Sequence, residues 1–156
     1  MVAASAGTAA ADPVGIGTFG RWMAFVSGTG SERVCYLGGT PQRSEGRYQR
    51  RGEVIFYVSY RPAEGPGDEI SFAAGYPYRP GSEARVTIDG KRFRLVTEGE
   101  TAWAASADQD QQIVTAFRSG RVMIVNGTSS RGTPTTDTFD LEGSSAAYWA
   151  MRNACS

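Results

Sequence analysis

The side chains that could carry chemistry in this 156-residue chain are arginines, carboxylates and two cysteines, because the sequence contains no histidine. Histidine is the commonest general base and the commonest metal ligand in proteins. No Cys-x-x-Cys pair, phosphate-binding glycine loop or Gly-x-Ser-x-Gly elbow occurs either. We therefore expect neither a metal site nor a cofactor, and we expect a protein that is not an enzyme.

One carboxylate, Asp137, keeps an enzymatic alternative open. It alternates with Phe139 and Leu141 along an extended run, so all three side chains face the same way and Asp137 becomes partly buried. A buried carboxylate with a raised pKa could work with Arg131 in a small periplasmic hydrolase. The other interpretation is that Asp137 accepts hydrogen bonds from loop amides or pairs with Arg131 structurally. We favour the structural role, since a single carboxylate makes a poor active site.

A β-hairpin at Asp89-Gly90 predicts a face that carries three arginines. Asp-Gly between two alternating runs is typical of a two-residue type I′ turn, which fixes the register of the strands. In that register Arg85 lies opposite Arg94, and Thr87 lies opposite Arg92. Opposed arginines repel each other unless an acid or an anion lies near them. The face either binds an anion or is neutralised by acids of the fold such as Glu83, Glu98 and Glu100.

A second basic segment follows Gly38-Gly39-Thr40-Pro41, which ends a strand. Its arginines are Arg43, Arg47, Arg50 and Arg51. Such a run is usually a solvated loop, but with the hairpin it could bind an anionic envelope or host-surface component. The segment 75–81 adds Tyr76 and Tyr78 beside prolines, which either form a recognition surface or cover the end of the fold.

The elements that must position these side chains are mostly strands. Twenty glycines, short apolar runs and frequent turn residues indicate an all-β protein. We predict a single β-sandwich over residues 18–156, and a disordered segment or signal-peptide remnant over 1–17. Strands are predicted at 19–27, 32–37, 53–60, 69–74, 85–88, 91–95, 121–125 and 135–141. Two short helices are predicted at 108–119 and 145–154, capped by Asp108 and Ser144.

Charge and hydropathy exclude two classes of partner. Sixteen basic and sixteen acidic residues leave no net charge, so no global field attracts nucleic acid. No stretch approaches the roughly 20 apolar residues of a membrane-spanning helix.

The two cysteines, Cys35 and Cys155, are either buried thiols or a disulfide. Ala9-Ala10-Ala11 resembles the small-residue end of a secretory signal, and exported proteins are oxidised. We therefore predict a Cys35–Cys155 disulfide, which would contribute about 4–5 kcal/mol on the chain-entropy model.

Several spaced motifs together resemble the invasion-associated locus B family. They are Gly52-x-x-x-Phe56-x-Val58-x-x-Arg61-Pro62, Ser71-x-x-x-Gly75-Tyr76-Pro77, Ile88-Asp89-Gly90-x-x-Phe93, Trp103, Ala116-Phe117-x-x-Gly120, Ser130-Arg131-Gly132-Thr133-x-Thr135-x-Asp137-x-Phe139-x-Leu141 and Cys155. The resemblance covers residues 20–155. It implies an immunoglobulin-like β-sandwich exported by Gram-negative bacteria, located in the periplasm, secreted or at the cell surface. Some members of the family are associated with entry into host cells, but the resemblance defines no biochemical activity. We predict a non-enzymatic, virulence-associated binding module.

Overall fold

The computed structural model describes residues 13–156, which contain eleven strands and two α-helices. The strands are β1 (Val14–Phe19), β2 (Trp22–Ser27), β3 (Val34–Gly39), β4 (Arg43–Glu45), β5 (Ile55–Tyr60), β6 (Asp68–Ala73), β7 (Glu83–Ile88), β8 (Lys91–Glu98), β9 (Thr101–Ala104), β10 (Val122–Thr128) and β11 (Pro134–Asp140). The helices are α1 (Ala107–Ser119) and α2 (Ser144–Ala154), with short 3-10 turns at Gly30–Glu32 and Pro62–Glu64.

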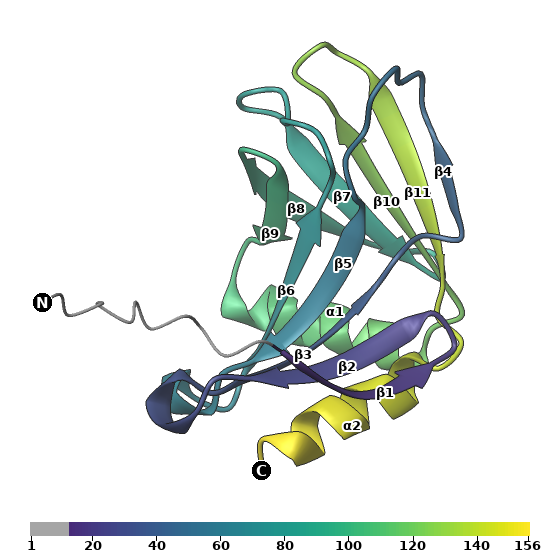
Figure 1. The fold of residues 1–156 in the computed structure, drawn as a ribbon. Helices are drawn as coiled ribbons and strands as arrows, with labels where there is room; N and C mark the ends of the chain where they lie inside the picture. The colour runs from purple at the N-terminus through teal and green to yellow at the C-terminus, as the bar shows by residue number, and fades with distance from the viewer. Residues whose placement is uncertain (1–12) are drawn as a thin grey trace, which may run out of the picture.

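All eleven strands join one antiparallel sheet that folds over on itself. The hydrogen-bonded order is β1-β2-β3-β5-β6-β9-β8-β7-β10-β11-β4. The half that contains β3, β5 and β6 lies against the half that contains β7, β10 and β11, and the two helices close the lower end (Figure 1). The predicted β-sandwich with two short helices is therefore confirmed. The sequence did not indicate that β9, paired with β6 and β8, makes the two layers continuous.

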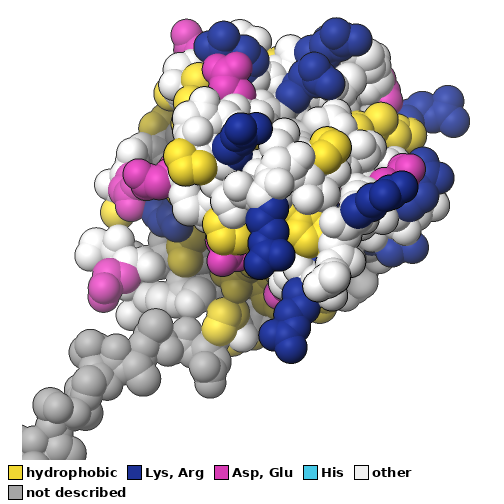
Figure 2. Space-filling model, turned by 90° about the horizontal axis from the view of Figure 1, so that it is seen from above, with side chains coloured by type: hydrophobic (Ala, Val, Ile, Leu, Met, Phe, Trp, Pro, Cys, Tyr) yellow, Lys and Arg dark blue, Asp and Glu magenta, His cyan; other side chains and the backbone are white. Residues whose placement is uncertain are grey.

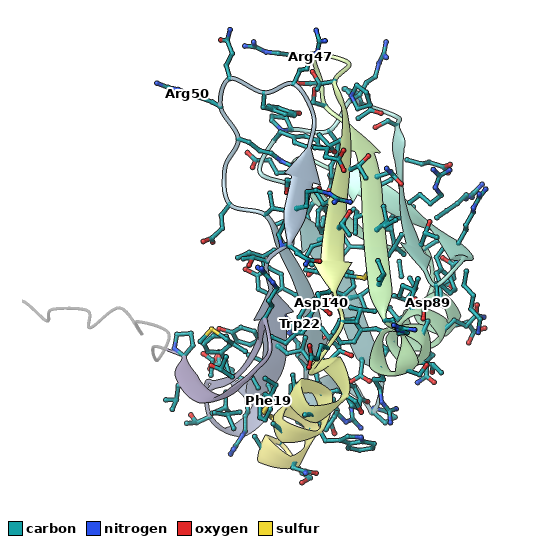
Figure 3. All side chains as sticks on the ribbon, turned by 90° about the vertical axis from the view of Figure 1, so that its right-hand side faces the viewer. Phe19, Trp22, Arg47, Arg50, Asp89 and Asp140 are labelled. Atoms are coloured by element: carbon teal, nitrogen blue, oxygen red, sulfur yellow. A yellow bond between two sulfur atoms is a disulfide. The ribbon has the colours of Figure 1, made fainter. Side chains whose placement is uncertain are left out.

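Aromatic rings from both halves of the sheet form the core. The Phe139 ring of β11 lies 6.1 Å from the rings of Phe56 and Phe72, measured between ring centroids. Trp22 packs edge-on against Phe117 of α1 at 4.8 Å. Its indole Nε1 donates a hydrogen bond to the backbone carbonyl of Asp140, 3.0 Å away, and the two residues lie side by side in Figure 3. This contact joins β2 to the far end of the sheet.

The β7–β8 hairpin has the predicted register, with Arg85 opposite Arg94 and Thr87 opposite Arg92. Both turn residues, Asp89 and Gly90, have positive φ, at 47° and 89°. A type I′ turn requires this conformation, and it is the reason for the Asp-Gly sequence. The Asp89 carboxylate also accepts hydrogen bonds from the backbone amides of residues 121 and 122, so the turn is anchored to β10.

Both helices begin where predicted to within a few residues, but their caps differ. Ser106 caps α1 and accepts a hydrogen bond from the Gln109 amide, so Asp108 lies inside the first turn instead of capping it. Gly143, with φ of 88°, precedes α2. The Ser144 hydroxyl donates to the Phe117 carbonyl, 2.8 Å away, and so joins the helices to each other instead of capping.

The prediction that residues 14–17 are disordered is wrong. They belong to β1, which pairs with β2 from Val14 opposite Val26 to Phe19 opposite Trp22. Val14 and Ile16 alternate with glycines for only four residues and are both exposed, so no buried face marks a strand; pairing with β2 and packing against α2 hold the segment in place. The signal-peptide prediction for residues 1–12 lies outside the described residues.

The predicted disulfide is confirmed. Cys35 of β3 and Cys155 at the end of α2 are bonded, with their Cα atoms 6.1 Å apart and a sequence separation of 120. The bond fixes the C-terminal helix against the first half of the sheet.

Candidate functional site

The segment between β4 and β5 crosses from one layer of the sandwich to the other, and a buried ion pair holds it. The Arg51 guanidinium donates two parallel hydrogen bonds to the Asp137 carboxylate, at 2.8 and 2.7 Å. Its Nε donates a third to the Ala74 carbonyl at 2.8 Å. The Asp137 side chain is 1% exposed and that of Arg51 is 12% exposed. Bidentate pairs of this kind are stronger and more directional than single hydrogen bonds.

This pair corrects two predictions. Arg51 is not a surface arginine, and the partner of Asp137 is Arg51 instead of Arg131. Both carboxylate oxygens of Asp137 are engaged with a permanent cation, so the carboxylate is poorly placed to exchange protons with a substrate. The rest of the segment is largely exposed, as predicted for a solvated loop, although Arg43–Glu45 forms the short strand β4 against β11.

Three tyrosines pack around the ion pair. The rings of Tyr48 and Tyr76 stack at 5.3 Å with 15° between their planes, and Tyr78 contacts Tyr76 edge-on at 5.2 Å. The Arg51 guanidinium lies 5.0 Å from the centre of the Tyr76 ring, within the range of a cation–π interaction. Tyr76 and Tyr78 are buried, at 3% and 5% exposure. The 75–81 segment was predicted either to form a recognition surface or to cover the end of the fold. In the structure the two buried rings cover the end of the fold.

Burial also raises the pKa of two of these phenols, Tyr76 and Tyr78. It raises the pKa of Tyr76 above its ordinary value, against the opposing effects of a hydrogen bond to Thr135 and the charge of Arg51. Burial likewise raises the pKa of Tyr78, and the neighbouring Tyr76 adds to the effect. Tyr76 therefore serves as a packed ring whose hydroxyl hydrogen-bonds with Thr135, and Tyr78 serves as a packed ring beside it.

The loop at residues 129–133, between β10 and β11, forms the opposite wall. The Ser129 hydroxyl, which is buried, accepts hydrogen bonds from the amides of Arg131 and Thr133 at 3.2 and 3.1 Å. The Ser130 amide donates to the Pro77 carbonyl at 2.8 Å, which ties this loop to the tyrosine segment. The backbone that carries Arg131 is therefore fixed before any ligand arrives.

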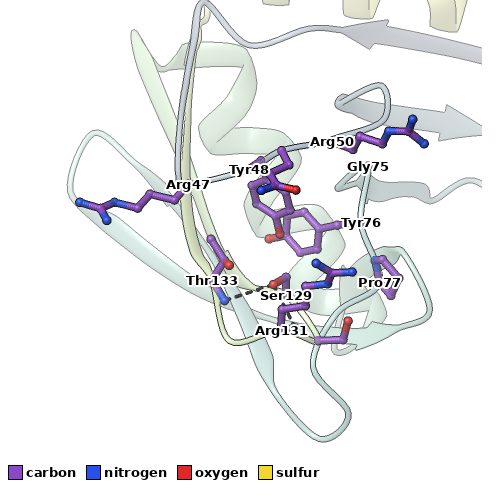
Figure 4. Close-up of a pocket in the computed structure, with 11 residues that line it drawn as sticks. Arg47, Tyr48, Arg50, Gly75, Tyr76, Pro77, Ser129, Arg131 and Thr133 are labelled. Carbon is purple, nitrogen blue, oxygen red and sulfur yellow. Dashed lines mark hydrogen bonds between the residues drawn. The ribbon is translucent and has the colours of Figure 1, made fainter.

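Between these walls lies a pocket of about 830 Å³. We call it the arginine pocket; it is lined by Arg47, Tyr48, Gln49, Arg50, Gly75, Tyr76, Pro77, Ser129, Ser130, Arg131 and Thr133 (Figure 4). No Asp or Glu is among these lining residues of the described chain. Seen from above, this end of the molecule displays more basic than acidic side chains (Figure 2).

Three exposed arginines of this pocket, Arg47, Arg50 and Arg131, have no ion-pair partner within residues 13–156. In Figure 4 the Arg47 and Arg50 side chains extend to opposite sides of the stacked tyrosines, and Arg131 lies between them. Guanidinium groups that are free of carboxylates are available to carboxylate or phosphate oxygens. The arrangement therefore suits an anionic ligand.

The hairpin arginines lie elsewhere, on the outer face of the second half of the sheet. On this face, residues of five adjacent strands lie opposite one another in the order Arg94, Arg85, Asn126, Thr136 and Glu45, with Glu45 on the edge strand. Acids neutralise part of this face: Glu83 pairs with Arg94 at 3.4 Å, and Glu45 pairs with Arg43 at 3.2 Å. Exposed pairs of this kind contribute only about 0–1 kcal/mol.

The structure thus separates the predicted arginines into two groups and adds members that the sequence did not indicate. Arg47 and Arg50 join Arg131 and Tyr48 at the pocket, whereas Arg85, Arg92, Arg94 and Arg43 share the outer face. Nothing local in the sequence marks Tyr48 as part of a site. Its role depends on the stack with Tyr76, 28 positions later, which no sequence period predicts.

Between residues 13 and 156, no group of three or more His, Cys, Asp or Glu side chains is placed to hold a metal ion. In the same part of the chain, no helix combines the length and the apolar character needed to cross a bilayer.

Comparisons with known proteins agree on one family. The family model described as "Invasion associated locus B (IalB) protein" matches residues 22–152. A solved structure, the invasion associated protein B of Bartonella henselae, is similar with a TM-score of 0.63 and 18% sequence identity, covering 91% of this chain and 98% of that one. At this identity the likeness concerns the fold. No curated protein matches the chain significantly.

Proposed function

Because the chain belongs to the invasion associated locus B family, we propose that it is an exported, non-enzymatic binding module for an anionic component of the cell envelope or of a host-cell surface. The observation that carries this proposal is the arginine pocket. Arg47, Arg50 and Arg131 lie around a preformed hollow and have no acidic partner in the described part of the chain. An unpaired cluster on a chain without net charge concentrates positive potential in one place.

Export to the periplasm, the cell surface or the medium is supported by the Cys35–Cys155 disulfide. Disulfides persist in oxidising compartments and are rare in the reducing cytosol. The alanine-rich residues 9–11 are consistent with the end of a secretory signal.

The state of Asp137 supports a non-enzymatic role. A general acid or base must reach the substrate, whereas both oxygens of this carboxylate contact Arg51 and its side chain is 1% exposed. An association with host cells is supported by the name of the similar Bartonella protein. Under this proposal the module recognises a surface and performs no turnover.

The test is a comparison of two matched triple variants. Purified protein would be titrated against heparin, hyaluronan and vesicles that contain anionic lipid, at low and at physiological salt. We expect wild-type binding that weakens with salt, because exposed charges are screened. Arg47→Gln with Arg50→Gln and Arg131→Gln should abolish binding.

The control is Arg85→Gln with Arg92→Gln and Arg94→Gln, which removes the same charge from the outer face. Binding that survives in the control and is lost in the pocket variant supports the pocket. Loss in the hairpin variant alone would transfer the site to the outer face and overturn the assignment to the pocket. Absence of binding to every anion by folded wild-type protein at low salt would overturn the binding function.

A further inference from the structure

We propose that the arginine pocket takes a linear acidic polysaccharide, whose carboxylates or sulfates are spaced along the chain, and not a single small anion. This inference rests on the proposed function and specifies its ligand. It depends on three features of the pocket: the spread of its charges, the chemistry of its lining and the rigidity of its walls.

The charges of the pocket are spread out. Arg47 and Arg50 extend to opposite sides of the tyrosine stack, with Arg131 beside Tyr76 between them (Figure 4). The Arg47 and Arg50 side chains also reach away from the sandwich in Figure 3. One phosphate or carboxylate contacts two guanidinium groups at once only if they converge. Diverging arginines instead match a ligand that carries a separate anionic group for each of them.

Polar, uncharged side chains lie among the arginines, beside the tyrosine rings and Pro77. Gln49, Ser130 and Thr133 offer amide and hydroxyl groups, and no carboxylate of the described chain lines the pocket. Such groups donate and accept hydrogen bonds in the way that sugar hydroxyls require. The volume of about 830 Å³ is far larger than one small anion needs and lies within the range of sites for drug-sized ligands.

The walls are fixed in advance. Arg51 ties one wall to Asp137, and the Gly52 amide donates to the Gly75 carbonyl at 2.8 Å. The Ser129 hydroxyl holds the other wall through the Arg131 and Thr133 amides. A preformed site loses less conformational entropy on binding, which offsets the cost of ordering a flexible saccharide chain.

A nucleic acid fits these features less well than a polysaccharide. Recognition of single strands relies on exposed aromatic rings on which bases stack. Here Tyr76 is buried, and Tyr48 stacks on it.

The test is a length series measured by isothermal titration calorimetry with the wild-type protein. The probes are galacturonic acid, its dimer, tetramer and octamer, inorganic phosphate, heparin oligomers of graded length, and a single-stranded DNA with the charge of the longest oligomer. We expect affinity to rise at least about tenfold from the monomer to the longest oligomer of one acidic saccharide series, because linked contacts act together.

Single variants show how many arginines contact anionic groups of the ligand. For a polyanion, the slope of log K against log salt reflects the number of anionic groups neutralised. Each of Arg47→Gln, Arg50→Gln and Arg131→Gln should lower the magnitude of that slope by up to about one. Arg85→Gln, on the outer face, should leave it unchanged.

The failures of the two proposals are distinguishable. Phosphate or galacturonic acid that binds as tightly as the longest oligomers would overturn the polysaccharide inference and leave an anion-binding module in place. DNA that binds more tightly than every acidic saccharide would also overturn the inference. If neither small anions, saccharides, DNA nor vesicles bind, the proposed function itself fails.

Discussion

Arg51 and Asp137 are separated by 86 positions in sequence and joined by two hydrogen bonds of 2.8 and 2.7 Å. Arg51 belongs to the segment that enters β5 in one half of the sheet, and Asp137 to β11 in the other. The pair therefore closes the sandwich at the end opposite the helices, and the tyrosine stack and the arginine pocket lie around it. One buried ion pair thus serves both the fold and the candidate site.

Asp137→Asn should destabilise the protein strongly. The substitution keeps the shape of the side chain but leaves the Arg51 cation in a buried place without a counter-charge. Breaking a buried pair in this way costs about 3–5 kcal/mol. Urea denaturation should show a lower midpoint with an unchanged slope.

The control for that prediction replaces both partners. Arg51→Met with Asp137→Leu removes the buried charges together, and such replacements are often close to neutral. We expect the double variant to be more stable than Asp137→Asn alone. A single variant as stable as the wild type would show that the pair contributes little.

Local sequence patterns predicted much of the fold. The Asp89-Gly90 turn fixed the register of β7 and β8, because a two-residue turn allows only one pairing. The apolar spacing of α1 correctly indicated Ile113, Val114 and Phe117 as its buried face. By contrast, β1 was missed, since its conformation comes from pairing with β2 and not from any pattern of its own.

The candidate site was also predicted only in part, because local patterns do not show which distant segments come together. The sequence indicated that Asp137 is partly buried, because alternation along a strand is a local property. It did not identify Arg51 as the partner, since the contact depends on how the β4–β5 segment crosses the sandwich. The grouping of Arg131 with Arg47 and Arg50 likewise arises from the approach of loops that are distant in sequence.

Gly39→Ala should destabilise the core through a close approach of backbone to ring. A Cβ at this position of β3 would lie 2.6 Å from Cζ3 and 2.8 Å from Cδ2 of the fully buried Trp22. Overpacking of this kind costs about 1–3 kcal/mol. Gly67→Ala is the control, because no atom lies within 4 Å of its Cβ, and it should change the free energy of unfolding by less than about 0.5 kcal/mol. Equal effects of the two substitutions in thermal denaturation would contradict the packing.

Tyr148→Phe should remove a pH dependence of stability at alkaline pH. Burial, together with the hydrogen bond to Asp68 at 2.6 Å and the charge of that residue, raises the pKa of Tyr148 to about 12. Between about pH 10 and pH 12 the folded protein keeps the phenol proton and the unfolded chain loses it. Unfolding then releases a proton, so the stability contributed by this group is complete below pH 10 and decreases as the pH rises.

The measurement is the free energy of unfolding of wild type and variant across that range. The advantage of the wild type should shrink as the pH rises from about 10 to about 12, since phenylalanine has no proton to lose. Trp149→Phe, at the neighbouring half-exposed position, should leave the wild-type pH profile in place. A constant difference between wild type and Tyr148→Phe would show that the pKa of Tyr148 is not raised.

Ser129→Ala should weaken both the fold and the binding of anionic ligands. The buried hydroxyl accepts hydrogen bonds from the amides of Arg131 and Thr133, and its loss leaves both donors without that partner. The two hydrogen bonds are partly buried, so their loss should cost about 1 kcal/mol. The loop then holds Arg131 less firmly, so affinity for an acidic oligosaccharide should fall even at temperatures where the variant is fully folded.

Ser130→Ala, at an exposed position of the same loop, should preserve stability to within about 0.5 kcal/mol. If Ser129→Ala binds the oligosaccharide as tightly as the wild-type protein does, the fixed position of Arg131 is not what makes the pocket bind.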